Sequence, residues 1–138
     1  MQVYKNKWFH RWAAREGLGD QTLLAAVKEM EAYVKRNPAD VFGRNYLGYL
    51  HYCLKNYHGA LEHLDTAVQL RPDNCYGYAK LSRVYAGLYL KSSKIDPRRP
   101  GYRQKAEEMY QLASAVETPD PRRIRWLRRY LQSKEIIP

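Results

Sequence analysis

The sequence predicts an all-α protein built as an array of stacked helical hairpins, and three observations support this fold class. Apolar residues recur at helical spacing through most of the chain. The 138 residues include only 8 Gly and 7 Pro, too few for the turns that a strand-rich domain needs about every 8 to 12 positions. Pro38 and Pro72 each close an apolar helical stretch and lie 34 residues apart. A repeat length in the thirties is typical of stacked helix pairs.

The first 40 residues are expected to form a helical hairpin. Residues 8–16 have helical character, and two glycines then break the chain before Asp20, which we expect to cap the next helix. That helix is predicted over 21–36, where Val27 and Met30 belong to an apolar face. The hairpin can serve as a shortened first repeat.

Residues 41–74 form the clearest repeat unit. Its signature positions are Leu47, Gly48, Tyr57, Ala60, Leu64, Ala67 and Pro72. Gly48 and Ala60 are small, as expected where two antiparallel helices cross at close approach, and Pro72 ends the second helix. These residues at these spacings resemble the tetratricopeptide repeat (TPR), a helix–turn–helix unit that stacks into a solenoid.

A second TPR-like unit is expected over 75–119. Ser82 occupies the small position of its first helix, and Ala106 and Ala113 mark a second helix that is displaced along the chain. We therefore expect an extended loop over 92–101, because its prolines and glycine oppose continued helix.

The final segment, 120–138, is predicted to be a capping helix and tail. Asp120 and Pro121 form a typical helix start, and Ile124, Leu127 and Leu131 lie on one face of the predicted helix. The expected fold is thus a single domain of about seven helices: a TPR-like α-solenoid of three antiparallel hairpins plus a C-terminal cap.

The N-terminal segment carries a second resemblance. Its opening, Val3-Tyr4-Lys5-Asn6-Lys7-Trp8-Phe9, and the following residues to about position 33 resemble the start of the RelE/HigB-type toxins, which are ribosome-dependent mRNA nucleases. In those toxins the Arg, Lys, Tyr or His residues that cleave RNA lie on a later antiparallel sheet, which helical repeat sequence replaces here. No catalytic residue can therefore be carried over. The segment could be a fusion, a remnant or part of an engineered chimera, or simply an N-terminal capping hairpin.

Motifs for several kinds of chemistry are missing from the sequence. It contains no HExxH pattern, no GxSxG, no P-loop and no Gly-rich dinucleotide turn, and its two cysteines, Cys53 and Cys75, have no ligand spacing. We therefore expect no catalytic residues, no metal, no cofactor and no enzymatic activity. No stretch has the composition of a signal peptide or a membrane span, so we expect a cytoplasmic protein without a membrane partner.

The TPR resemblance implies a concave groove lined by the first helix of each unit. The groove residues it assigns are Phe42, Asn45, Tyr49, Tyr52, Tyr76 and Arg83. Aromatic rings with Asn and Arg suit a peptide or helix, so the first interpretation is an adaptor that binds a protein partner.

The alternative interpretation rests on charge. The chain carries a net charge of +10, and residues 91–138 supply +6 of it from 12 basic and 6 acidic groups. The arginines of this patch are Arg98, Arg99, Arg103, Arg122, Arg125 and Arg129. They could bind the phosphate backbone of RNA, as expected for an RNA- or ribosome-associated protein related to a toxin–antitoxin system. A polar outer face is also what a capping helix requires. The sequence leaves the partner's identity and the oligomeric state open.

Overall fold

A computed structural model describes residues 19–138, which form six helices and no strand. The helices are α2 (Asp20–Arg36), α3 (Val41–Cys53), α4 (Tyr57–Leu70), α5 (Cys75–Lys91), α6 (Arg99–Ala115) and α7 (Pro121–Ser133). The all-α class is therefore confirmed for this part of the chain. The helix expected over 8–16 lies outside the described residues. The chain divides into two compact units, unit 1 (residues 1–70) and unit 2 (residues 71–138).

Polar side chains cap the starts of α3, α5 and α7, and of these caps the one at Asp120 was predicted from the sequence. The Asp40 carboxylate accepts hydrogen bonds from backbone N–H groups at the start of α3, Asn74 does so for α5, and Asp120 does so for α7. These bonds satisfy N–H groups that have no partner within the helix. Such caps are local interactions, because each side chain bonds to N–H groups two or three residues away.

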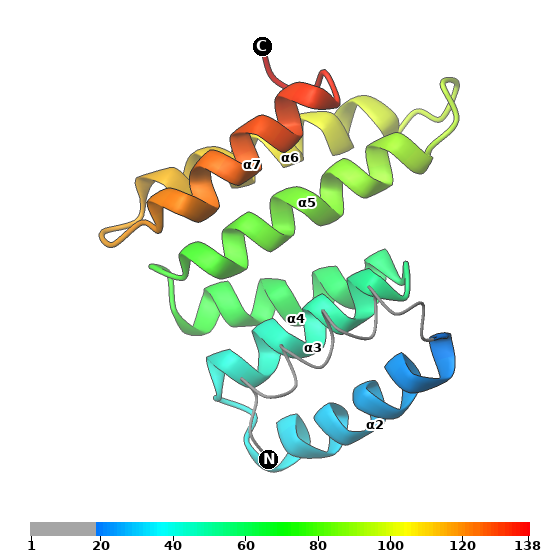
Figure 1. Cartoon of the computed structure of the whole chain (residues 1–138), viewed down its shortest axis with the longest axis vertical. Helices are drawn as coiled ribbons and strands as arrows, with labels where there is room; N and C mark the ends of the chain where they lie inside the picture. The colour runs from blue at the N-terminus through cyan, green and yellow to red at the C-terminus, as the bar shows by residue number, and fades with distance from the viewer. Residues whose placement is uncertain (1–18) are drawn as a thin grey trace. The chain divides into compact units, whose positions relative to one another are not determined.

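In unit 1, α3 packs against both α2 and α4 (Figure 1). The core between α2 and α3 is built from apolar side chains on the facing stripes of these helices. Its buried members are Val27, Met30, Val34, Tyr46, Leu47 and Leu50. On the other side of α3, Gly48 lies so close to Leu64 of α4 that an added Cβ would come within 2.6 Å of the Leu64 Cγ atom. The prediction that a small residue is needed at this crossing is confirmed.

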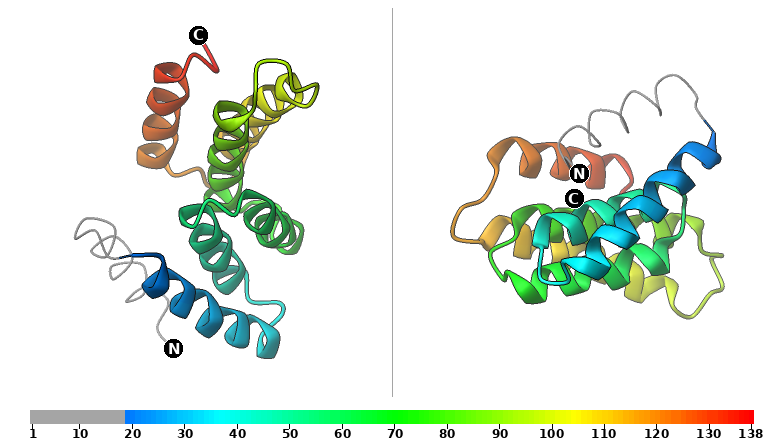
Figure 2. Two further views of the ribbon diagram at one scale, coloured as in Figure 1. Left: turned by 90° about the vertical axis from the view of Figure 1, so that its right-hand side faces the viewer. Right: turned by 90° about the horizontal axis from the view of Figure 1, so that it is seen from below.

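In unit 2, α5 and α6 form an antiparallel hairpin, and α7 packs against both (Figures 1 and 2). Ser82 is fully buried where α5 crosses α6, and its hydroxyl donates a 2.7 Å hydrogen bond to the Ala106 carbonyl oxygen. The predicted apolar face of α7 is buried, with Ile124, Leu127 and Leu131 each at most 7% exposed. This apolar face is therefore the one through which α7 packs within unit 2.

The chain turns back on itself after α7. Glu135 adopts a left-handed conformation with φ of 58°, and the Ile136 N–H donates to the Leu131 carbonyl oxygen, which closes the helix end. Ile136 is then buried in the unit 2 core. The Arg103 guanidinium donates to the carbonyl oxygens of Glu135 and Ile136 at 3.0 and 3.3 Å and so holds the tail.

Two local expectations are wrong. Gly19, not Asp20, is the N-cap of α2, and Asp20 is the first helical residue, where its negative charge still favours the helix dipole. The loop after α5 is also shorter than expected, because α6 begins at Arg99 and includes Pro100 and Gly101 in its first turn. Proline is tolerated there since the N–H group it lacks would have no partner within the helix.

Among residues 19–138, no helix combines the length and apolarity needed to cross a membrane.

Candidate functional site

The outer side of α7 carries a row of arginines. Pro121 and the Asp120 cap fix where α7 begins, and the burial of Ile124 and Leu127 fixes its rotation. Arg122, Arg125 and Arg129 follow one another at spacings of three and four residues, which places them on one helix face, and all three are exposed. We call these three residues the arginine face.

The positively charged side chains of α7 repel one another. Pro121–Ser133 contains five arginines and no acidic residue. Arginines three or four positions apart repel by a few tenths of a kcal/mol per pair, and Arg122 and Arg123 lie at the positive end of the helix dipole. Isolated α7 is therefore electrostatically strained, and a bound polyanion would relieve that strain.

The five arginines of α7 differ in their contacts. Arg123 lies 3.6 Å from an Asp120 oxygen and over the Tyr76 ring, and Arg128 donates a 2.8 Å hydrogen bond to the Tyr110 hydroxyl. The side chains of the arginine face make no hydrogen bond or ion pair with any residue that the structure describes. Their donors remain available to an anionic ligand.

An aromatic pair lies beside the arginine face. The rings of Trp126 and Tyr130 are nearly parallel, with an interplanar angle of 7° and centroids 5.3 Å apart. The Arg83 guanidinium of α5 lies over both rings, 4.5 Å from the Trp126 centroid and 5.5 Å from that of Tyr130. Trp126 nevertheless stays 49% exposed. The indole is thus held in place by its neighbours while much of its surface remains accessible.

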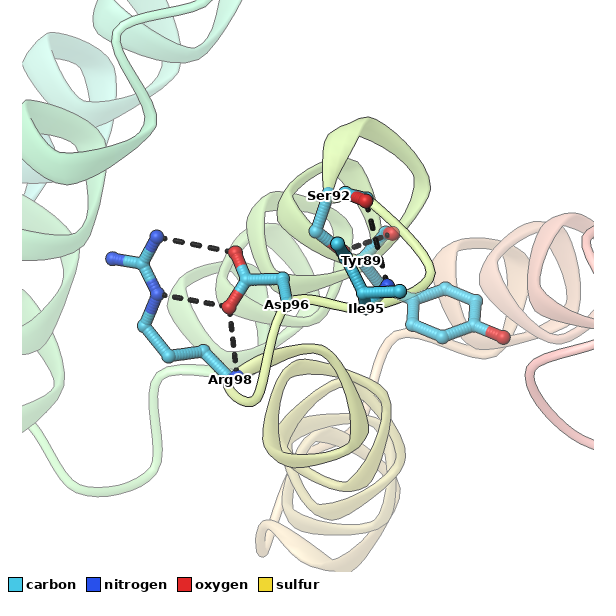
Figure 3. Close-up of polar contacts among 6 residues, drawn as sticks. Tyr89, Ser92, Ile95, Asp96 and Arg98 are labelled. Atoms are coloured by element: carbon cyan, nitrogen blue, oxygen red, sulfur yellow. Dashed lines mark hydrogen bonds and ion pairs between the residues drawn. The ribbon is translucent and has the colours of Figure 1, made fainter.

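The other predicted arginines of the patch have partners within unit 2. The Arg98 guanidinium donates bidentate hydrogen bonds of 3.1 and 3.2 Å to the two carboxylate oxygens of Asp96 (Figure 3). These bonds stabilise the ionised carboxylate and so lower the pKa of Asp96. Arg99 lies 4.0 Å from the centroid of the Tyr89 ring. With Arg103 holding the tail, these three arginines are engaged in the loop and tail structure rather than free.

Two residues of the predicted groove, Tyr76 and Arg83, lie in unit 2 and contact α7. The Arg123 guanidinium carbon lies 4.5 Å from the centroid of the Tyr76 ring, and the Lys80 Nζ atom lies 5.2 Å from it. Arg83 lies over the Trp126 ring. The structure therefore brings both residues against α7, Tyr76 at Arg123 and Arg83 at Trp126 and Tyr130.

The four remaining groove residues lie in unit 1. Phe42 is 65% exposed, whereas Asn45 is buried. Tyr49 and Tyr52 are stacked with ring centroids 6.5 Å apart. Peptide binding in a groove stays a prediction.

Sequence reasoning missed a histidine pair in unit 1. The rings of His51 and His63 stack with centroids 5.3 Å apart, and the Arg44 guanidinium lies 3.2 Å from the His63 Nδ1 atom. Burial lowers the pKa of both histidines, and for His63 the neighbouring His51 and Arg44 lower it further. The two residues come from different helices twelve positions apart, so no motif spacing signals the pair.

A family model matches the N-terminal part of the chain. Residues 1–40 match the model of the RelE toxin of the RelE / RelB toxin-antitoxin system, in agreement with the resemblance at the N-terminus. The structure describes residues 19–40 of this segment, which contain α2 and the Asp40 cap. No curated protein matches the chain.

This match overturns the expectation that the chain has no enzymatic activity. RelE toxins are ribonucleases that cleave mRNA on the ribosome, so similarity to them points toward catalysis. The motifs whose absence led to that expectation belong to metal, nucleotide and serine enzymes. A nuclease that acts through Arg, Lys, Tyr or His side chains needs none of them, which is why the inference failed.

Proposed function

We propose that this chain is an RNA- or ribosome-associated protein related to a toxin–antitoxin system, and that the arginine face of α7 binds the RNA backbone. The observation that carries the proposal is the set of three exposed arginines, Arg122, Arg125 and Arg129, whose side chains have no partner among the described residues. The similarity of residues 1–40 to RelE toxins supports RNA as the polyanion.

The electrostatics of α7 favour a phosphate ligand. The three arginines span about 10 Å along the helix at 1.5 Å per residue, so they can contact successive phosphates of one strand. Each guanidinium presents a rigid fork of donors that matches phosphate oxygens. Each contact also releases a counterion, and three contacts on single-stranded RNA are expected to contribute about −2 to the slope of log K against log salt.

The proposal is tested by measuring RNA binding by fluorescence anisotropy between about 50 and 200 mM salt. The triple variant Arg122→Glu/Arg125→Glu/Arg129→Glu is expected to lose binding and most of the salt dependence. A matched control, Lys28→Glu/Lys35→Glu/Arg36→Glu, changes the net charge equally at exposed positions of α2. It is expected to retain most of the affinity.

Two outcomes would contradict the proposal. The unmodified protein would fail to bind RNA even at the lowest salt, or the two triple variants would lose affinity equally. The second result would mean that net charge alone, and not the arginine face, attracts RNA.

A second candidate function, cleavage of mRNA on the ribosome, is favoured by the match at residues 1–40. Its test is to add the protein to translating ribosomes and to map mRNA 5′ ends by primer extension. Cleavage that needs ribosomes and disappears when residues 1–18 are removed would support it. Intact mRNA at a protein concentration that saturates RNA binding would contradict it.

We also propose that α3–α4 and α5–α6 are TPR-like hairpins. The small residues at the two helix crossings, Gly48 against Leu64 and Ser82 against Ala106, support this assignment. The packing of α7 on α5 and α6, with a polar outer side on α7, is also what a repeat cap requires.

A further inference from the structure

Phosphate binding by the arginine face does not explain why Trp126 is exposed. Its indole is 49% exposed although α7 has a well-formed buried face on which a large apolar residue could lie. The ring is also oriented by contacts, since it is parallel to Tyr130 and lies under the Arg83 guanidinium. An exposed aromatic ring that is fixed in orientation can bind a planar ligand at little entropic cost.

We propose that Trp126 is a stacking platform for an unpaired RNA base, so that the arginine face binds single-stranded RNA in preference to duplex. This inference rests on the proposed RNA-binding function and names its substrate class. Base stacking on aromatic side chains is a common means of holding single strands without sequence preference, because every base has a flat π surface.

The spacing of residues along α7 suits this arrangement. Arg122 precedes Trp126 by four residues and Arg129 follows it by three, so the two arginines flank the indole on the same side of the helix. They lie about 6 Å before it and about 4.5 Å after it along the axis. A base stacked on Trp126 would therefore have a basic residue near the phosphates on either side.

Duplex RNA could not use this platform. Its bases are already stacked and paired, and its major groove is too deep and narrow for side chains to read. Only the phosphate contacts would remain for a duplex. The arginine face alone would then bind both forms, and Trp126 would supply the difference between them.

Arg83 and Tyr130 are positioning residues in this scheme. Tyr130 lies one helical turn after Trp126, and Arg83 reaches the pair from α5. Together they restrict the rotation of the indole. The positive charge of Arg83 also adds to the attraction for phosphate near the platform.

The first test compares the affinity of the full chain for a single-stranded RNA and for an RNA duplex of equal length. Trp126→Ala is expected to weaken single-strand binding by roughly 5- to 100-fold, to leave duplex binding unchanged and to leave the salt slope unchanged. Trp126→Phe should retain most of the preference, because it keeps an aromatic surface. Leu112→Ala removes another large apolar side chain, 43% exposed on α6, and is expected to have no effect.

A second measurement does not depend on the stability of the alanine variant. The chain has three tryptophans, Trp8, Trp12 and Trp126, so Trp8→Phe/Trp12→Phe leaves Trp126 as the one indole fluorophore. Saturating single-stranded RNA is expected to quench its emission through stacking, while duplex RNA leaves the emission largely unchanged.

The outcomes separate this inference from the function on which it rests. The stacking platform is refuted if Trp126→Ala binds single-stranded RNA as tightly as the unmodified protein. It is also refuted if saturating single-stranded RNA leaves the Trp126 emission of the Trp8→Phe/Trp12→Phe variant unchanged. Binding that still depends on the arginine face would leave the proposed function intact. If the unmodified protein binds no RNA at low salt, the proposed function itself fails.

Discussion

The crossing of α3 and α4 allows a quantitative test of the fold through Gly48→Ala. An ideal Cβ on Gly48 would lie 2.6 Å from the Leu64 Cγ atom and 3.3 Å from the Ala60 backbone oxygen. Carbon atoms in optimal contact are separated by about 3.5–4.0 Å, so the crossing would have to open by about 1 Å. Leu64 is fully buried, and its Cγ atom is a branch point that cannot swing away like the end of a flexible chain.

The magnitude follows from two opposing effects. Overpacking a buried contact typically costs about 1–3 kcal/mol. Replacing glycine by alanine inside a helix contributes about 1 kcal/mol in the opposite direction. For Gly48→Ala we therefore expect a net loss of about 1 kcal/mol in the free energy of unfolding.

The assay is urea unfolding followed by far-UV circular dichroism, with two comparisons. Gly101→Ala makes the same substitution in the first turn of α6, where an added Cβ meets nothing within 4 Å, and should stabilise by about 0.4–1 kcal/mol. In a Leu64→Ala background the obstructing Cγ atom is gone, so Gly48→Ala should become stabilising. If Gly48→Ala stabilises the unmodified protein as well, the close approach of α3 and α4 is refuted.

Three further predictions concern single contacts. Ser82→Ala removes the buried hydrogen bond to the Ala106 carbonyl and is expected to cost about 1 kcal/mol by urea unfolding; an unchanged midpoint would contradict this. The pKa values of His51 and His63 are lowered from 6.5 in the folded chain. The unfolded chain therefore binds more protons than the folded chain as the pH falls below 6.5, and thermal denaturation should show that the stabilisation from the neutral histidines is full above that pH and decreases below it. Lys55→Gly should raise the free energy of unfolding by about 0.5–1 kcal/mol, because Lys55 has a φ of 61° that glycine adopts without strain; a loss of stability would argue against that backbone conformation.

The helices themselves were predictable because their signals are local. A capping side chain such as Asp120 bonds to N–H groups two or three residues away, and an apolar stripe such as Ile124, Leu127 and Leu131 depends only on the helical period. The need for small residues at Gly48 and Ser82 was also readable, because the repeat pattern places them at helix crossings. Errors arose at boundaries, as at Pro100, where a helix breaker is also a good first-turn residue.

The candidate site was predictable only in part. The sequence placed Arg122, Arg125 and Arg129 on one face of a helix, because that follows from spacing alone. It treated Arg98 and Arg103 as equivalent to them, although Arg98 pairs with Asp96 and Arg103 holds the C-terminal tail. Whether an arginine is free depends on what lies around it in space.

By itself, then, the sequence determined the class of the fold, the approximate extent of most helices and the basic character of α7. Each of these is set by interactions within a turn or two of the chain. Only the tertiary structure decided that Arg83 lies over Trp126 and that His51 stacks on His63. These contacts join different helices, and they form only when packing between helices fixes which side chains meet.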